Sequence, residues 1–281
     1  MTAPVVLAAV DLGAGTATVI TRAAHVARAI GGTVSVLHCV DPEEPGPNAR
    51  RRLAPLLDAD AELGELIAEV RVRPHIHGLP EAIAEEADHL DAAVIVTGRS
   101  QRPFLAQLFK GGTTVALLRR TRRPLLLARL PAERPYDAAL VALDLTRPLD
   151  PPVSAARRLL GPLRMELLTV LDAATRLQLV VANVGEEAVA VYERDRKQGA
   201  YTALTACAAR LAEPGWAPSS VAVEGKPEEE ITRRLQAVGA EVLVLQPDQK
   251  DWLTRTLVGS LTETVLERPV DCDVLALPAP G

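Results

Sequence analysis

The side chains best suited to chemistry in this chain lie directly after apolar runs that predict β-strands. Asp11 follows the run Val5 to Val10, and the segment Gly98 to Thr113 follows the run Ala92 to Val96. That segment has no acidic residue between its ends and three basic ones: Arg99, Arg102 and Lys110. Glycines let a backbone approach a phosphate chain closely, and amides at the start of a helix bind its oxygens. The segment therefore predicts an anion site.

The polar segments recur in the same order in the second half of the chain. Asp144 follows the run Ala138 to Leu143, as Asp11 follows its own strand. Gly78-Leu79-Pro80 returns as Gly225-Lys226-Pro227. A duplicated unit of about 140 residues has ordinary domain size. We therefore predict two tandem domains, 1–132 and 133–281, with extra residues in the middle of the second.

Strand and helix signals alternate along the first repeat. Strands are predicted at Val5–Val10, Thr33–Val40, about Val70–His75, Ala92–Val96 and Pro124–Leu130. Helices are predicted at Thr16–Ile30, over the apolar positions from Leu53 to Val70, from Pro80 onward and at Thr113–Arg120. Strands that alternate with helices pair in parallel. Each repeat is thus predicted to be a doubly wound α/β sandwich with a five-stranded parallel sheet.

Ligands of such sheets bind at the carboxyl ends of the strands, near the point where the strand order reverses. In the first repeat these ends carry Asp11, the corner Cys39-Val40-Asp41 and the segment Gly98 to Thr113. We expect these three parts to lie together.

The segment after the fourth strand resembles the nucleotide loop of universal stress proteins. In that family glycine, two residues, glycine, nine residues, and glycine with serine or threonine follow this strand. Gly98 and Gly111 match, Gln101 replaces the second glycine, and Gly112 or Thr113 stands at the last place. The resemblance implies a Rossmann-like fold of the adenine nucleotide alpha hydrolase kind. It also implies that ATP or another adenine nucleotide binds at Asp11, Cys39, Val40, Gly98, Arg99, Gln101, Gly111, Gly112 and Thr113, with no metal beyond an accompanying Mg²⁺.

The second repeat has a degenerate version of the same site. Two of its stretches, Val223–Ile231 and Asp271–Leu277, resemble the second half of tandem universal stress proteins of the E type. The residues that correspond to the first site are Asp144, Val170, Gln246, Gln249, Gly259 and Ser260. Both leading glycines are missing, and Glu263 in the first turn of the next helix competes with an anion for the amides. We expect weak or no nucleotide binding there.

Composition excludes several classes of protein. The chain has a net charge of −5, against the basic face that nucleic acids require. It has no apolar run long enough to span a bilayer and no secretory signal, so we expect a cytoplasmic protein. The three cysteines, Cys39, Cys207 and Cys272, are widely spaced and predict buried inert thiols.

Other candidate residues have plainer explanations. His75 and His77 alternate on a strand, but no third metal ligand has a defined spacing. The run Arg119-Arg120-Thr121-Arg122-Arg123 complements a helix end. No motif of a hydrolase, metalloprotease or P-loop enzyme is present. We predict no catalytic residue, although slow incidental ATP hydrolysis stays open.

Three functions remain open at this point. The first is a stress-response regulator that binds adenine nucleotide in repeat one and an unknown protein partner. The second is a nucleotide-free scaffold, which the glutamine at position 101 favours. The third is an enzyme such as a nucleotidyl transferase, against which the absent acid and base groups argue.

The resemblance also predicts an intramolecular pseudo-dimer, in which Leu125–Leu130 pairs with Val274–Leu277, because family members commonly pair through their fifth strands. A further homodimer is left open. The insert Asp172–Gly199 is either a lid over the second site or a dimer contact.

Overall fold

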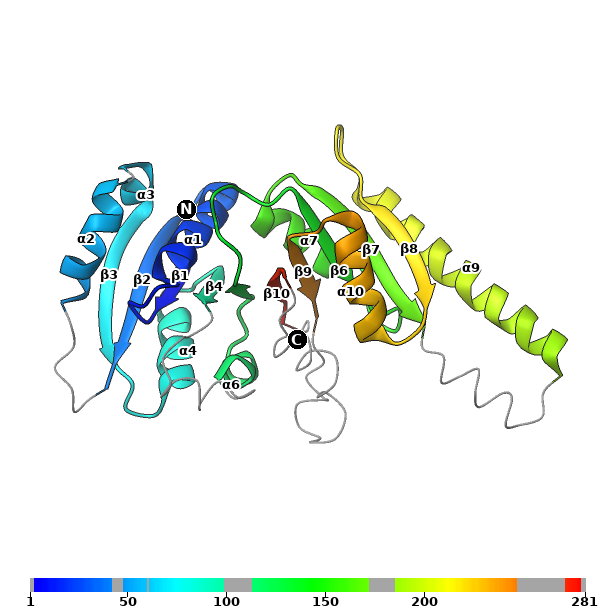
Figure 1. Ribbon diagram of the computed structural model, residues 1–281, viewed down its shortest axis with the longest axis horizontal. Helices are drawn as coiled ribbons and strands as arrows, with labels where there is room; N and C mark the ends of the chain where they lie inside the picture. Colours follow the sequence, from blue (N-terminus) through cyan, green and yellow to red (C-terminus); the bar gives the residue numbers. More distant parts are fainter. Residues whose placement is uncertain are drawn as a thin grey trace. The chain divides into compact units, whose positions relative to one another are not determined.

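The computed structural model forms two compact units, each an α/β arrangement (Figure 1). The residues that it describes are 3–41, 48–59, 61–98, 113–171, 185–246 and 271–278. The first unit comprises Met1–Pro135, Arg158–Gly161 and Pro247–Gly281, and the second comprises Tyr136–Arg157 and Pro162–Gln246. Each unit is described by itself below.

The first unit contains a sheet in the strand order β3-β2-β1-β4-β5-β10. Its strands are β1 (Val5–Val10), β2 (Thr33–Val40), β3 (Ile67–Pro74), β4 (Val94–Gly98), β5 (Leu125–Ala128) and β10 (Asp273–Ala276). Its helices are α1 (Thr16–Ile30), α2 (Ala49–Ala59), α3 (Ala61–Leu66), α4 (Leu79–His89) and α6 (Thr113–Arg120). The first five strands are parallel, and the order reverses between β1 and β4.

The second unit repeats the order of strands and helices. Its strands run in the order β9-β6-β7-β8, with parallel pairing throughout. The elements are β6 (Ala138–Ala142), α7 (Asp150–Leu160), β7 (Arg164–Leu171), α9 (Glu186–Leu211), β8 (Ser219–Glu224), α10 (Pro227–Val238) and β9 (Val242–Leu245). The last residues of α7, from Arg158, belong to the first unit.

The predicted start of the chain is confirmed residue by residue. β1, α1 and β2 have the predicted bounds, and α1 ends at Gly31, which adopts the left-handed conformation with φ of 63°. Its amide reaches back to the last carbonyls of the helix. β4 lies two residues later than predicted and β5 is shorter at both ends.

The prediction of helical spacing as far as Val70 is wrong. Helix α3 ends at Leu66, and β3 begins at Ile67. Opposite β2, Ile67 pairs with Val34 but Glu69 pairs with Ser35, so one extra residue, Ala68, bulges from β3. A bulge inserts a residue and shifts the alternation of side chains by one place. The apolar spacing from Ile67 to Val70 therefore imitates a helix.

Helices cover both faces of the first unit's sheet. Side chains of α4 and α6, such as Ile83 and Leu117, pack on Leu7, Leu37 and Ile95 in an aliphatic core. Helix α1 packs against β1, β2 and β4. Crossover connections are right-handed, so reversing the strand order at β1 puts α1 and α4 on opposite faces. The carboxyl ends of β1, β2 and β4 are left at one edge.

Strand β10, the last of the second repeat, pairs antiparallel with β5 in the first unit. Val274, Leu275 and Ala276 lie opposite Leu127, Leu126 and Leu125. The predicted pairing of the two fifth strands is thus confirmed. It covers an apolar strand edge that would otherwise be open to aggregation.

A buried ion pair fixes β10 to α1. Nε of Arg22 lies 3.1 Å from Oδ2 of Asp273, and the side chains are 3% and 0% exposed. Oδ1 of Asp273 accepts hydrogen bonds from the amides of Arg129 (2.6 Å) and Leu130 (2.8 Å). The Nη atoms of Arg22 donate to the carbonyls of Pro131 and Arg134 in the interdomain linker. The Arg22–Asp273 pair therefore connects helix α1, strand β10 and the linker.

No helix in the described ranges is both long and apolar enough to cross a membrane. The three cysteines are free thiols.

The Asp273→Asn variant is expected to lower the free energy of unfolding by about 3–5 kcal/mol, because it leaves the Arg22 charge buried without its counterion. Urea denaturation measures the effect. Asp88→Asn is the matched control, since Asp88 pairs with Arg123 at the surface of the same unit and should cost about 0–1 kcal/mol. Equal losses in the two variants would contradict the importance given to the buried pair.

Candidate functional site

The ends of three strands of the first unit bring the predicted site residues into one row. Val10 lies opposite His38 on β2, and Ala9 lies opposite Thr97 on β4. Along the register, Asp11 therefore follows opposite Cys39, and Gly98 follows opposite Val10, one residue before Asp11. All three lie at the carboxyl edge of the sheet. This edge includes the reversal point between β1 and β4, as predicted (Figure 1).

The loop between β1 and α1 is fixed by several hydrogen bonds. Oδ1 of Asp11 accepts a bond from the amide of Gly13 at 2.8 Å. Leu12 is buried with φ of 57°, and its carbonyl accepts a bond from Nη2 of Arg52 on α2 at 2.9 Å. The amide of Thr16 bonds to the carbonyl of Gly13 at 3.1 Å. The backbone therefore has a defined course from Asp11 into the first turn of α1.

Thr16 is a candidate that was not predicted from the sequence. It begins α1, is 9% exposed, and its hydroxyl has no hydrogen-bond partner among the described residues. A buried hydroxyl without a partner is costly, and such groups are unusual in folded proteins. Its sequence signal was the pattern Gly13-Ala14-Gly15-Thr16 between a strand and a helix.

The corner at the end of β2 is held mainly by the backbone. The carbonyl of Val40 accepts a bond from the amide of His75 at 3.0 Å. Cys39 is half-buried, and burial raises the pKa of its thiol to about 12, while the charge of Arg73 opposes the rise and that of Glu86 adds to it. Cys39 is therefore a neutral thiol at physiological pH. The sequence predicted buried thiols, which is confirmed for Cys207 and Cys272 but not for Cys39.

A polar contact joins the ends of β1 and β2, and the second unit has a counterpart. The ring Nδ1 of buried His38 lies 2.9 Å from the carbonyl of Val10, and because a carbonyl can only accept, Nδ1 carries the proton. In the second unit the hydroxyl of Thr169 donates to the carbonyl of Leu143 at 3.0 Å. Both bonds anchor the residue before the strand-end aspartate.

Gly98 is required by packing as well as by the predicted loop. A Cβ atom at this position would lie 2.7 Å from Cγ2 of Val19 on α1. Carbon atoms do not approach so closely, so the glycine lets α1 pack against the end of β4. The sequence predicted this glycine for phosphate binding only, because the packing reason depends on a helix far away in the chain.

Several predicted residues lie outside the described part of the chain. They are Arg99, Gln101, Gly111 and Gly112 in the first repeat, and Gln249, Gly259 and Ser260 in the second. The insert Asp172–Gly199 is described only from residue 185. Thr113 is the first residue of α6. The roles predicted for these residues stay predictions.

The second repeat brings its own residues into a similar row. Val141 lies opposite Val244 on β9 and Ala142 opposite Leu168 on β7, so Asp144, Val170 and Gln246 follow at one edge. Here Oδ1 of Asp144 accepts bonds from the amide (2.9 Å) and hydroxyl (2.8 Å) of Thr146.

An arginine crosses the row in the second repeat. Nε of Arg147 lies 3.7 Å from Oδ2 of Asp144, and its Nη1 donates to the carbonyl of Gln246 at 3.2 Å. Arg147 thus reaches from the end of β6 to the end of β9. The residue at the same distance from the strand-end aspartate in the first repeat is Ala14, whose methyl group is too short to do so.

The described residues include no group of three or more His, Cys, Asp or Glu side chains that could hold a metal ion. Two arginines of the basic run at the end of α6, Arg120 and Arg123, pair with acidic residues on and just after α4. Nη2 of Arg120 lies 2.5 Å from Oε1 of Glu81, and Nη1 of Arg123 lies 2.7 Å from Oδ1 of Asp91. The predicted role of this run beside a helix end stays a prediction.

Comparison with protein families gives the same result for both halves of the chain. A model of the universal stress protein family matches residues 4–129 and again residues 135–278. The chain belongs to the universal stress protein family. The two matches make it a tandem member, as the repeated sequence predicted. No curated protein sequence matches the chain.

Solved structures resemble this universal stress protein over nearly its full length. A universal stress protein from Archaeoglobus fulgidus DSM 4304 is 13% identical, with a TM-score of 0.61, and the match covers 99% of this chain and 97% of that one. A functionally unknown protein from Pseudomonas aeruginosa PAO1 is 18% identical, with a TM-score of 0.59 and coverage of 98% and 92%. The predicted α/β fold with a mostly parallel sheet and two tandem domains is confirmed.

The Gly98→Ala variant is expected to lower the free energy of unfolding by about 1–3 kcal/mol, because the new methyl group overlaps Val19. In a double-mutant cycle with Val19→Ala, part of this loss should return, with a coupling of about 0.5–3 kcal/mol. Gly199→Ala is the control, since nothing lies within 4 Å of the place its methyl group would take and alanine favours helix α9. Purely additive effects of Gly98→Ala and Val19→Ala would rule out this packing role.

Proposed function

We propose that this tandem universal stress protein is a regulatory protein that binds one adenine nucleotide, at the carboxyl edge of the first repeat. The row of Asp11, Cys39 and Gly98 at the reversal point of the sheet carries the proposal. Sheets of this type bind ligands at that point. The buried hydroxyl of Thr16 supplies a polar group that a ligand would satisfy.

In this proposal each part of the site has a separate task. The carboxylate of Asp11 accepts hydrogen bonds from the ribose hydroxyls, and the Cys39-Val40 corner lies against the adenine. Gly98, Arg99, Gln101, Gly111, Gly112 and Thr113 surround the phosphates, which gain from the basic charge of the loop and from the amides at the start of α6. ATP and other adenine nucleotides fit these tasks, and Mg²⁺ would enter only with the nucleotide.

We propose that the second repeat does not bind nucleotide. Arg147 already joins Asp144 to the carbonyl of Gln246, so the protein's own side chain meets the strand-end carboxylate. Breaking these contacts would offset the gain from a ligand. Gln249, Gly259 and Ser260 keep the spacing of the loop but not its first two glycines.

Nucleotide occupancy would act by changing the affinity for a protein partner, and no catalytic role is proposed beyond slow incidental hydrolysis of ATP. We also keep as proposals a cytoplasmic location, a domain boundary between Ala132 and Glu133, and a homodimer of the tandem chain. The alternative function is a nucleotide-free scaffold. It is favoured by Gln101, which places a side chain where the family's loop has a glycine.

The test is to denature freshly purified protein and identify any released nucleotide by chromatography and mass spectrometry. Wild-type protein is expected to release about one adenine nucleotide per chain if binding reaches nanomolar affinity. Asp11→Ala should weaken ATP binding by at least about tenfold in calorimetry, because a charge-assisted hydrogen bond is lost. Gly111→Val should abolish it by blocking the approach to the phosphates.

Asp144→Ala is the matched control, since it removes the equivalent carboxylate of the second repeat and should leave ATP binding unchanged. If wild-type protein releases no nucleotide and binds no ATP at about 1 mM, the regulator is excluded in favour of the scaffold. If Asp144→Ala reduces binding and Asp11→Ala does not, the proposed site is in the wrong repeat.

A further inference from the structure

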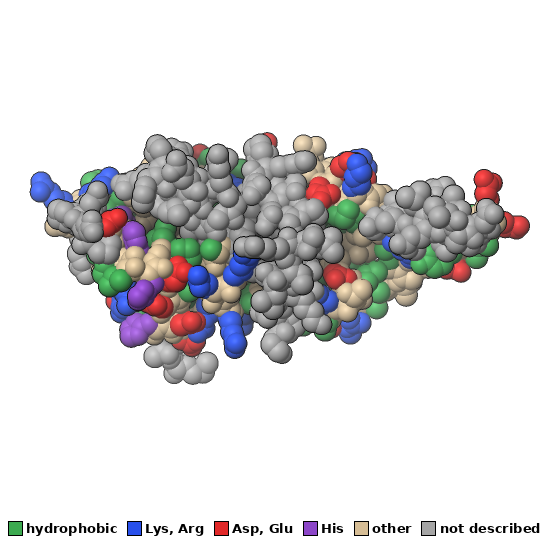
Figure 2. Space-filling model, turned by 90° about the horizontal axis from the view of Figure 1, so that it is seen from below, with side chains coloured by type: hydrophobic (Ala, Val, Ile, Leu, Met, Phe, Trp, Pro, Cys, Tyr) green, Lys and Arg blue, Asp and Glu red, His purple; other side chains and the backbone are tan. Residues whose placement is uncertain are grey.

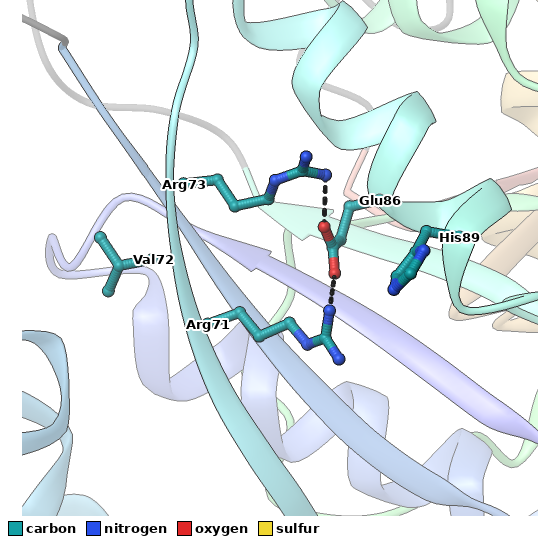
Figure 3. A pocket seen from close by; sticks show the side chains of 5 residues that line it. All are labelled: Arg71, Val72, Arg73, Glu86 and His89. Atoms are coloured by element: carbon teal, nitrogen blue, oxygen red, sulfur yellow. Dashed lines mark hydrogen bonds and ion pairs between the residues drawn. The ribbon is translucent and has the colours of Figure 1, made fainter.

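A hollow of about 390 Å³ lies between the outer strand β3 and helix α4 of the first unit. It is lined by Arg71, Val72, Arg73, Glu86 and His89. Figure 3 shows the guanidinium groups of Arg71 and Arg73 on the two sides of the Glu86 carboxylate, with the His89 ring beside it and Val72 pointing to the other side of the strand. Figure 2 shows histidine side chains close to basic and acidic ones on the face that it presents. The hollow is therefore polar and accessible.

Glu86 is a buried carboxylate that orients both arginines. Its side chain is 1% exposed, and its two oxygens accept bonds from Nη1 of Arg71 at 2.7 Å and Nη1 of Arg73 at 2.5 Å. Nε of Arg71 also lies 2.8 Å from Glu69, which in turn accepts a bond from Ser35. Both carboxylates are thus engaged by N–H donors, and the donors form the inner surface of the hollow.

The second repeat shows that the fold does not require two arginines here. Arg234 on α10 stands 148 residues after Glu86, the same spacing that separates Gly259 from Gly111. Arg234 donates to both carboxylate oxygens of the buried Glu166. Its Nε binds Oε1, and its Nη2 lies 2.5 Å from Oε2. One bidentate pair therefore satisfies a buried carboxylate at this helix.

The first repeat uses its arginines differently. Arg71 and Arg73 each donate to Glu86 through Nη1 only. Neither guanidinium therefore binds that carboxylate in the bidentate way. Among the described residues the side chain of Arg73 makes no other hydrogen bond or ion pair, and the ring of His89 makes none. Donors thus remain on two elements around one hollow.

We propose that this hollow is an anion site that binds the phosphate group of a small molecule. Arg71 and Arg73 are two residues apart on a strand, which places their stems about 7 Å apart and on one face. Arginine forks match phosphate oxygens, and His89 approaches from the helix as a third donor. Donors from three directions suit a tetrahedral oxyanion better than a planar carboxylate. The hollow is adjacent to the proposed nucleotide site, since Arg73 lies opposite Cys39 on β2, but none of its lining residues belongs to that site.

The experiment titrates the full-length protein with inorganic phosphate at constant ionic strength, followed by calorimetry and by NMR of the arginine Nε–H signals. The signals of Arg71 and Arg73 are expected to shift. Arg73→Gln should weaken phosphate binding by at least about tenfold, and Arg73→Lys, which keeps the charge beside Glu86 but loses the fork, should weaken it less. Succinate is expected to bind more weakly than phosphate.

Three controls make the outcome decisive. Arg119→Gln removes the same charge from an exposed position on α6 and should leave binding unchanged. Thermal unfolding of Arg73→Lys should match that of wild type, which separates lost binding from lost folding. Gly111→Val, which disrupts the proposed nucleotide loop, should leave the phosphate-induced shifts of the Arg71 and Arg73 signals unchanged, because these signals report on the hollow alone. No response up to about 10 mM phosphate, or equal binding by wild type and Arg73→Gln, would overturn the proposal.

Discussion

The buried ion pair between Arg22 and Asp273 is the contact on which the arrangement of the first unit depends. It joins residues near opposite ends of the chain, since Arg22 lies on α1 and Asp273 begins β10. Each charge also meets backbone groups: the carboxylate accepts the amides at the end of β5, and the guanidinium holds the linker carbonyls. Burial of two charges is tolerated only when such bonds satisfy them. The last strand of the second repeat is thereby fixed in the sheet of the first.

Helix α1 transmits this constraint to the candidate site. Its first residue, Thr16, lies beside the loop that carries Asp11; Val19 packs where Gly98 has no side chain; and Arg22 reaches Asp273. Val19 and Arg22 are three residues apart, so they share a face of the helix. The position of α1 relative to the strand ends is therefore fixed by two contacts, that of Val19 with Gly98 and that of Arg22 with Asp273. A site assembled on such rigid elements is well suited to bind a ligand with little reorganisation.

Much of this fold could be predicted from the sequence because the strongest signals are local. The apolar residues of β1, α1 and β2 follow the regular spacing of strands and of a helix, and Gly31 marks the end of α1. The bounds of these elements were therefore predicted to the residue. The bulge at Ala68 was not predicted, because an extra residue in a strand imitates helical spacing. The Arg22–Asp273 pair, the contact of Val19 with Gly98 and the bridge made by Arg147 join distant segments, and no spacing in the sequence reveals them. The row of strand ends was predictable because parallel topology alone aligns them.

The difference proposed between the two repeats is that the carboxyl edge of the first binds adenine nucleotide and that of the second does not. Hydrogen exchange with mass spectrometry, with and without ATP, tests this difference directly, since bound ligand slows exchange of the amides that it covers. We expect slower exchange in peptides that contain Asp11 to Thr16 and Cys39 to Asp41, with unchanged exchange from Leu143 to Arg147. Protection confined to the second repeat, or no protection in either repeat, would show that the proposed difference is wrong.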